Sequence, residues 1–429
     1  MLIEFKVGNF LSFKKTVTLS MVAMRRTDED DQPNLFGYHD LNILKSTAIY
    51  GANASGKSNF IKALRFYRNY IRNSSIGTQV DERIPIKRFV LSDDIADEPA
   101  FFEATFVHNS VKYRYGFEAT ENEIIGEWLF GAPKGREAEF FVRNRANIKI
   151  GDYFKQAKGL DKVTRDNALF LSVAAQFNNE QAKNIFEWMN DFNVISGLDD
   201  HHYLPYTLER IEDKKNKNSI LNLLKVADLS ISDIRLDTQE LSINDLEDDQ
   251  IALINDRINL VKKKLTKKND SIELDEKIIQ NELKTVHRKY NNEKSSGQYE
   301  FSLSEESKGT QKLLALAGPI IDTLENGKVL VVDELEARLH PLLTKYIVSL
   351  FNSKKHNLNN AQLIFVTHDV NFLRNKTLRR DQVWFIEKNR YGASDLFSMI
   401  EYNVRKDANY YSDYLSGKYG AIPVIHTDE

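Results

Sequence analysis

A glycine-rich turn between an apolar strand and a helix limits most strongly what this chain can fold into. The stretch 46–70 contains the pattern G-x-x-x-x-G-K-[ST], with Gly51, Gly56, Lys57 and Ser58 at its fixed positions. Glycines let the backbone approach a phosphate closely, and the N–H groups of the loop and of the following helix point at the anion. An apolar run precedes the turn and apolar residues recur at helical spacing after it, which argues against an ordinary glycine turn. The stretch therefore predicts a nucleotide-binding loop.

The residue types of this loop each have a chemical role. Lys57 is expected to reach the β- and γ-phosphates as a point charge, and the Ser58 hydroxyl is expected to be a ligand of Mg²⁺. ATP and Mg²⁺ are the expected cofactors, although no base-reading pattern separates ATP from GTP. The residues expected to contact the nucleotide are the loop and the first helical turn: Gly51, Ala52, Asn53, Ala54, Ser55, Gly56, Lys57, Ser58 and Asn59.

The composition is that of a globular protein with more than one subdomain. The chain has 429 residues, a hydrophobic fraction of 41% and no cysteine, which excludes disulfides, thiolate metal sites and cysteine nucleophiles. No signal sequence and no apolar run of membrane-spanning length is visible, so we expect a cytoplasmic protein without a membrane partner. The formal net charge of −3 gives no overall basic field. Any contact with nucleic acid must therefore come from a local basic patch.

Two further apolar strands end in residues that suit phosphate chemistry. The run 328–334 ends in Asp333 and Glu334, and the run 362–367 is followed by His368. Asp333 is expected to hold Mg²⁺, and Glu334 to orient and deprotonate the water that attacks the γ-phosphate. His368 can donate a hydrogen bond to the γ-phosphate. Three phosphate-directed strand ends in one chain predict an ATP-hydrolysing enzyme.

The two halves of this predicted site are far apart in the sequence. Residues 101–117 alternate between apolar and polar positions around a turn at 108–110, which predicts an antiparallel hairpin with a buried face. The segment 207–294 is rich in charged residues, leucine and isoleucine, and predicts a helical hairpin or bundle. We therefore expect an N-terminal lobe over 1–206, a helical insertion over 207–294 and a C-terminal lobe over 295–429.

Three other features have weaker functional readings. Gln176 lies where a strand is expected to give way to a helix, and it could reach a metal or the attacking water. The run of Asp199, Asp200, His201 and His202 has metal-ligating types, but adjacent residues of one loop rarely turn four ligands inward. The insertion holds a heptad seam and a basic cluster that is either a solvated helix face or a nucleic-acid contact. These are the residues Ile251, Ile254, Ile258, Val261 and Leu265, and the lysines Lys262, Lys263, Lys264, Lys267 and Lys268.

The long separation of the two halves resembles the ABC-type ATPase heads of the SMC and RecF group. Such heads carry a signature loop just before the second carboxylate strand, and residues 307–311 stand in that place with a lysine and a threonine where glycines are usual. The resemblance implies an α/β ABC-type head, with a mixed phosphate-loop sheet and an antiparallel β layer. It also implies that Ser307, Gly309 and Thr310 bind the γ-phosphate of ATP held by another copy, in a homodimer or a higher even oligomer.

The chain resembles more closely the RloA/AbiL-type AAA ATPases of bacterial phage defence and abortive infection. The segments that carry this resemblance are NFLSF, GANASGKSN, ESKGTQKLLALAGPIID, VVDELEARLHPLL, AQLIFVTHD and YLSGKYGAIP. The resemblance implies an ATP-driven switch or sensor subunit with a separately encoded, nuclease-like effector of the RloB or TOPRIM kind. The alternative is a DNA-repair ATPase of the SMC and RecF kind, which clamps nucleic acid through the lysines of the insertion.

Overall fold

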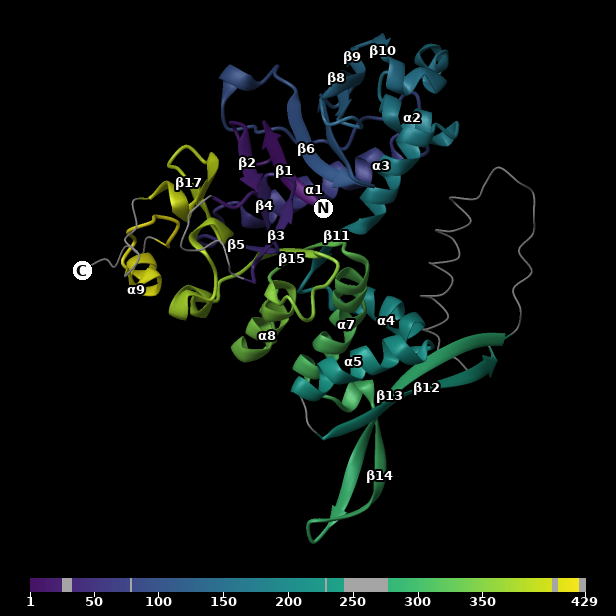
Figure 1. Cartoon of the computed structure of the whole chain (residues 1–429), viewed down its shortest axis with the longest axis vertical. Coiled ribbons are helices and arrows are strands. Elements are labelled where there is room, and N and C mark those ends of the chain that lie inside the picture. The colour runs from purple at the N-terminus through teal and green to yellow at the C-terminus, as the bar shows by residue number, and fades with distance from the viewer. Residues whose placement is uncertain (25–32, 78, 228–229, 243–276, 403–407, 424–429) are drawn as a thin grey trace. The chain divides into compact units, whose positions relative to one another are not determined.

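The computed structural model describes residues 1–24, 33–77, 79–227, 230–242, 277–402 and 408–423 (Figure 1). Contacts divide the chain into two compact units. The first combines Met1–Asp200 with Pro319–Glu429, and the second is His201–Gly318. The phosphate loop and the strand ends near 333 and 366 all belong to the first unit.

A six-stranded sheet carries the phosphate loop. Its strand order is β11-β15-β16-β5-β17-β18, with all neighbours parallel except β17 and β18. Every residue of β5 and β16 is buried, which explains their continuous apolar runs. Because β5, β15 and β16 run parallel, their carboxyl ends meet at one edge of the sheet. The bounds are β5 Ser46–Tyr50, β11 Phe192–Ser196, β15 Val329–Asp333, β16 Gln362–Val366, β17 Val383–Lys388 and β18 Ser394–Ser398.

An antiparallel layer of seven strands forms the other sheet of this unit, in the order β10-β9-β8-β7-β6-β1-β2. The predicted hairpin is confirmed, since β6 and β7 pair through a two-residue turn with positive φ at Asn109 and Ser110. The bounds are β1 Leu2–Gly8, β2 Val17–Ser20, β6 Ala100–His108, β7 Val111–Ala119, β8 Ile124–Gly131, β9 Ala138–Asn144 and β10 Asn147–Ile150. The predicted α/β class, with a phosphate-loop sheet and an antiparallel layer, is confirmed.

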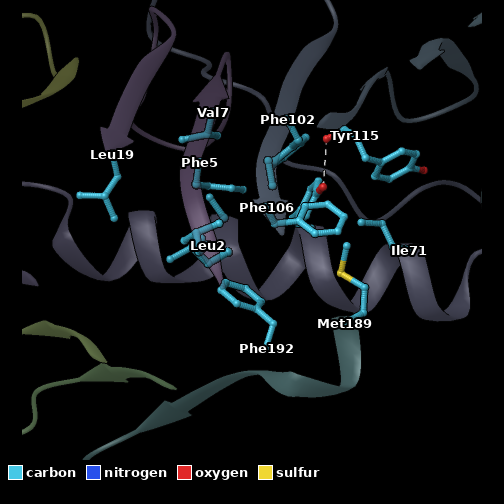
Figure 2. Close-up of a cluster of buried hydrophobic side chains, with 14 of the residues drawn as sticks. Leu2, Phe5, Val7, Leu19, Ile71, Phe102, Phe106, Tyr115, Met189 and Phe192 are labelled. Carbon is cyan, nitrogen blue, oxygen red and sulfur yellow. Dashed lines mark hydrogen bonds between the residues drawn. The ribbon is translucent and has the colours of Figure 1, made fainter. Parts of the chain in front are cut away.

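The helix that follows the phosphate loop, α1 (Lys57–Asn73), makes the main core of this unit. Apolar side chains of β1 and β6 point onto it, as Figure 2 shows. The ring of Tyr67 stacks on Phe117 at 5.9 Å and its hydroxyl donates to the Tyr115 carbonyl at 3.0 Å. Contacts of α1 with β11 and β15 connect the same helix to the six-stranded sheet. The position of α1 is therefore fixed from both sheets.

Shorter elements complete the first unit. They are the hairpin β3 Leu35–Tyr38 with β4 Leu41–Leu44, and the helices α2 Phe170–Gln176, α3 Glu180–Asp191, α8 Pro341–Asn352 and α9 Tyr410–Leu415. In the part of the chain that the structure describes, no helix has the length and apolar character needed to cross a membrane.

The second unit begins with helices and continues with long strands. Its elements are α4 Leu204–Ile211, α5 Lys214–Ala227, β12 Ile231–Ser242, β13 Lys277–Asn291 and β14 Lys294–Ser302. The helix α7 (Lys308–Asn326) starts in this unit. Its Gly318 allows α4 to approach, because a Cβ there would lie 2.5 Å from the Thr207 hydroxyl.

The helical prediction for 207–294 is right for α4 and α5 and wrong for β12 and β13. The buried Ile231 and Ile234 of β12 are three apart because a register shift lies between Ile231 and Asp233. This spacing imitates a helical period. The predicted heptad seam, Ile251 to Leu265, and the lysine cluster, Lys262 to Lys268, lie outside the described residues.

Candidate functional site

The phosphate loop has the backbone that its sequence predicts. Gly56 has φ of 115°, and an added Cβ there would lie 2.4 Å from the Ser394 hydroxyl oxygen. At Gly51 a Cβ would lie 2.4 Å from the Ile386 carbonyl oxygen. Neighbouring atoms therefore leave no room for a side chain at Gly51 or Gly56, and the positive φ of Gly56 also favours glycine. The loop opens directly onto the first turn of α1, whose N–H groups form an anion site.

Lys57 bonds to the loop that it follows. Its ammonium donates to the carbonyl oxygens of Gly51 at 2.8 Å and Ala52 at 2.9 Å. Burial lowers the pKa of Lys57, while nearby carboxylates raise it. These carboxylates belong to Asp333, Glu334 and Glu336. The arrangement holds a cation beside the loop and within electrostatic range of the predicted catalytic acids.

Ser58 and Asp333 come together although they are far apart in the sequence. Asp333 ends β15, and Ser58 lies near enough to its carboxylate to lower the pKa of that group. The carboxylate oxygen Oδ1 of Asp333 is buried and has no hydrogen-bond partner among the described residues. A hydroxyl and a carboxylate with spare oxygen lone pairs are the ligand types that Mg²⁺ prefers. The residues present therefore fit Mg²⁺, and their role as its ligands stays a prediction.

The negative charge of Asp333 lowers the stability of the folded state when no metal is bound, which gives a testable prediction. Burial raises the pKa of Asp333, and Ser58 only partly offsets this. A folded-state pKa above the unfolded one means that the stability contribution is present at low pH and is lost as pH rises through the folded value. We therefore expect Asp333→Asn to raise Tm by about one degree at pH 7 in metal-free buffer, which is what about 1 kcal/mol gives in a chain of 429 residues.

Thermal denaturation in EDTA at pH 7 and near pH 4 measures this effect. The gain should be much smaller at the lower pH, because the destabilisation is lost as pH falls from the raised folded-state pKa toward the ordinary pKa of aspartate. An exposed aspartate, Asp81→Asn, serves as the matched control. An equal Tm of the Asp333→Asn variant and the native protein at pH 7 would contradict the cost assigned to this charge.

Glu334 follows Asp333 in a left-handed backbone conformation, with φ of 54°. A glycine on the neighbouring strand end makes room for it, because a Cβ on Gly197 would lie 2.1 Å from the Glu334 carbonyl oxygen. The Gly197 N–H also donates to the Asp333 carbonyl at 2.7 Å. No sequence pattern marks Gly197 as a site residue, and only the pairing of β11 with β15 identifies it.

His368 lies just beyond β16, as predicted, and an unpredicted carboxylate holds it. Its backbone N–H donates to Glu336 Oε1 at 2.5 Å. Burial lowers the pKa of His368, and Lys57 lowers it further, against the opposing effect of Glu336, Glu334 and Asp333. The imidazole is therefore neutral at pH 7 and can donate one N–H. Glu336 Oε2 is buried without a partner among the described residues, so this carboxylate belongs to the candidate site.

A set of buried hydroxyls braces the phosphate loop from two distant segments. The Ser394 hydroxyl of β18 donates to the Ser55 carbonyl at 2.6 Å and lies 2.8 Å from the Ser12 hydroxyl. Ser12, in the turn between β1 and β2, also accepts from the Asn59 amide at 2.9 Å. No sequence pattern marks Ser12 or Ser394, because their roles depend on segments that meet only in the folded unit.

The role predicted for Gln176 stays a prediction, while the structure corrects the element in which this residue lies. Gln176 is the last residue of helix α2, so its predicted place between a strand and a helix is wrong. The apolar residues before it are a buried helix, and a short apolar run does not distinguish helix from strand. Among the described residues, no group of three or more His, Cys, Asp or Glu could hold a metal, so none forms around Asp199 and His202.

The predicted signature residues lie in the second unit, at the start of α7. The Ser307 hydroxyl accepts from the Thr310 N–H at 3.1 Å and lies 2.8 Å from the Thr310 hydroxyl. Ser307 thus caps the helix, with Gly309 in its first turn. The role of Ser307, Gly309 and Thr310 toward a nucleotide stays a prediction.

A family model matches residues 46–374, which is most of the chain, and its description reads "AAA domain, putative AbiEii toxin, Type IV TA system". The matched range includes the loop, Asp333, Glu334 and His368. No curated protein matches the sequence.

Solved structures with a similar arrangement have low sequence identity. The SMC head domain from Thermotoga maritima is 13% identical, with a TM-score of 0.40, and the match covers 92% of this chain and 98% of that chain. The recombination mediator protein RecF of the RecFOR pathway, with ATPrS, is 17% identical, with a TM-score of 0.37 and coverage of 92% and 98%.

Proposed function

The chain belongs to the AAA-domain family that matches residues 46–374, and from this premise we propose that it binds and hydrolyses ATP with Mg²⁺. The observation that carries the proposal is the convergence of three strand ends on the phosphate loop. Asp333 and Glu334 raise the pKa of Lys57, and Lys57 and Glu334 in turn act on the pKa of Asp333. All three residues also act on the pKa of His368. This is the group of charges that a triphosphate and its metal require.

In the proposed reaction the chain positions the triphosphate and the attacking water. The loop N–H groups and Lys57 bind the phosphates, and Ser58 with Asp333 hold the metal. Mg²⁺, when bound, supplies positive charge to the phosphate oxygens. Glu334 orients the water and accepts its proton, while neutral His368 donates a hydrogen bond to the γ-phosphate.

We propose further that hydrolysis needs two copies of the chain, each completing the ATP site of the other. The support is the start of α7, where hydroxyls and the N–H groups of the first turn form a second anion site. The resemblance to ABC-type heads assigns this site to the nucleotide of a neighbouring copy. A homodimer, or an even oligomer built from such dimers, is the expected assembly.

Mixing two inactive variants tests this arrangement. Lys57→Ala removes the phosphate-loop cation and Ser307→Arg blocks the start of α7, so each variant alone should lose turnover. A mixed dimer has one intact site, formed by the loop of the Ser307→Arg copy and the α7 start of the Lys57→Ala copy. An equal mixture should recover about a quarter of the native rate, since about half of the dimers are mixed and each has one site of two.

Two outcomes of the mixing experiment would contradict the shared site. Full turnover by Ser307→Arg alone would show that the start of α7 is not needed for hydrolysis. No recovery in a mixture that is shown by size-exclusion chromatography to contain dimers would place the whole site within one copy. Lys308→Arg, which changes the next residue without a change of charge, controls for a general disturbance of the helix start.

The cellular role that we propose is a switch subunit of an anti-phage system with a separately encoded effector. The support is the resemblance to phage-defence ATPases together with a family description that names a putative AbiEii toxin. Purification from the native operon, with ATP and with the Glu334→Gln variant, tests it by identifying the bound effector. The repair-type alternative depended on lysines 262–268, which lie outside the described residues.

A further inference from the structure

In the second unit, β13 and β14 extend beyond their neighbour β12 as a two-stranded ribbon. The strand β12 pairs with β13 only as far as His287, opposite Ile231, while β13 and β14 continue together to a tight turn (Figure 1). The turn residues Asn292 and Glu293 both have positive φ, as a two-residue hairpin turn requires. Every residue of β14 from Lys294 to Glu300 is exposed. The ribbon, defined as residues 288–298, is therefore open on both faces.

The ribbon is basic in a chain whose net charge is negative. It contains Arg288, Lys289 and Lys294 against the single acid Glu293. None of the three cations forms an ion pair with another described residue. The next acid along β14, Glu300, is already paired with Arg235 of β12. The local charge therefore attracts an anionic partner.

Exposed aromatic and small residues accompany these charges. Tyr290 is 57% exposed and Tyr299 is 52% exposed, so both rings and hydroxyls are available to a partner. Gly297 lies opposite Lys289, beside a register shift. A bulge of this kind increases the right-handed twist of a two-stranded ribbon.

Side-chain contacts stabilise the base of the ribbon, where β13 and β14 leave the three-stranded sheet. His287 Nε2 lies 2.7 Å from Glu306 Oε1, and the Thr285 hydroxyl donates to the same carboxylate. The His287 ring also packs edge-on against Phe301, with centroids 4.9 Å apart. These contacts join β13 and β14 to the residue before Ser307.

We propose that this ribbon binds duplex DNA. The major groove of B-form DNA admits a two-stranded β-ribbon, and cations on the ribbon would neutralise flanking phosphates. The twist and the two-residue turn make the ribbon narrow enough to enter the groove, and Tyr290, with Tyr299 at the base of the ribbon, can contact phosphates or sugars. Duplex RNA is a poorer fit, because its major groove is deep and narrow.

Fluorescence anisotropy with a labelled DNA duplex of about 25 base pairs and the full-length protein tests the proposal. The triple variant Arg288→Ala, Lys289→Ala, Lys294→Ala should lose at least about tenfold in affinity near 0.1 M salt. Its slope of log K against log salt should fall in magnitude by about two to three, since each contact contributes about 0.9. The control Lys134→Ala, Lys158→Ala, Lys162→Ala removes the same charge from exposed sites of the first unit and should bind as the native protein does.

Three results would overturn the assignment. The first is absence of duplex binding by the native protein at about 0.05 M salt. The second is native affinity and salt slope in the ribbon variant. The third is equal affinity for an RNA duplex of the same length. Because the assay contains no nucleotide, failure of this proposal leaves the ATPase proposal standing, and the reverse is also true.

Discussion

Glu334→Gln is expected to lower the rate of ATP hydrolysis by about 10²–10³-fold and to leave the affinity for ATP nearly unchanged. The amide keeps the size of the side chain, so the left-handed backbone and its contact with Gly197 are retained. It cannot accept the proton of the attacking water. Single-turnover hydrolysis measures the first quantity, and equilibrium titration with a fluorescent ATP analogue measures the second.

The structure supplies a competing carboxylate, so this experiment needs a matched partner. Glu336 lies in the same turn, holds the His368 N–H and has an unpartnered buried oxygen among the described residues. Glu336→Gln keeps an acceptor for that N–H and should reduce turnover by less than about tenfold. If Glu334→Gln retained turnover while Glu336→Gln lost it, the general base would be Glu336. Equal, severe losses would show that the two carboxylates act together.

The parts of the fold that the sequence predicts are those whose local pattern and tertiary environment agree. The loop after β5 needs glycine at Gly51 and Gly56 for reasons that the sequence alone states, and the turn at Asn109 and Ser110 has a clear alternating pattern around it. In the strands β12 and β13 the local sequence pattern does not agree with the tertiary environment. Residues 288–291 of β13 and 294–300 of β14 are exposed, so period-two alternation of buried apolar residues is absent there.

The same reasoning explains which site residues were found. Asp333, Glu334 and His368 end apolar strands, and parallel strands bring such ends to one edge. Ser12, Ser394 and Glu336 have ordinary sequence surroundings, and their relation to the loop depends on pairings between segments hundreds of residues apart. Gln176 shows the opposite error, because an apolar run that reads as a strand is a buried helix.

Lys57→Ala is expected to weaken ATP binding by about 10- to 100-fold, since a charged hydrogen bond to phosphate contributes about 1.5–3 kcal/mol. The structure suggests that the loss has two sources. The ammonium is a cation held beside the loop, and it also bonds to the carbonyls of Gly51 and Ala52, which it holds in the loop conformation. Titration with ATP at constant Mg²⁺ measures the affinity.

Lys57→Arg and Lys62→Ala separate these two sources. Lys62 is exposed on the same helix, so its removal changes the charge near α1 without touching the loop, and its variant should bind ATP within about twofold of the native protein. Arginine at position 57 keeps the charge but is too large to bond to both carbonyls in the same way, because the side chain is buried. If Lys57→Arg binds ATP as weakly as Lys57→Ala, the geometry of the loop decides affinity. If it binds nearly as the native protein does, charge decides, and native affinity in Lys57→Ala itself would place the triphosphate elsewhere in the fold.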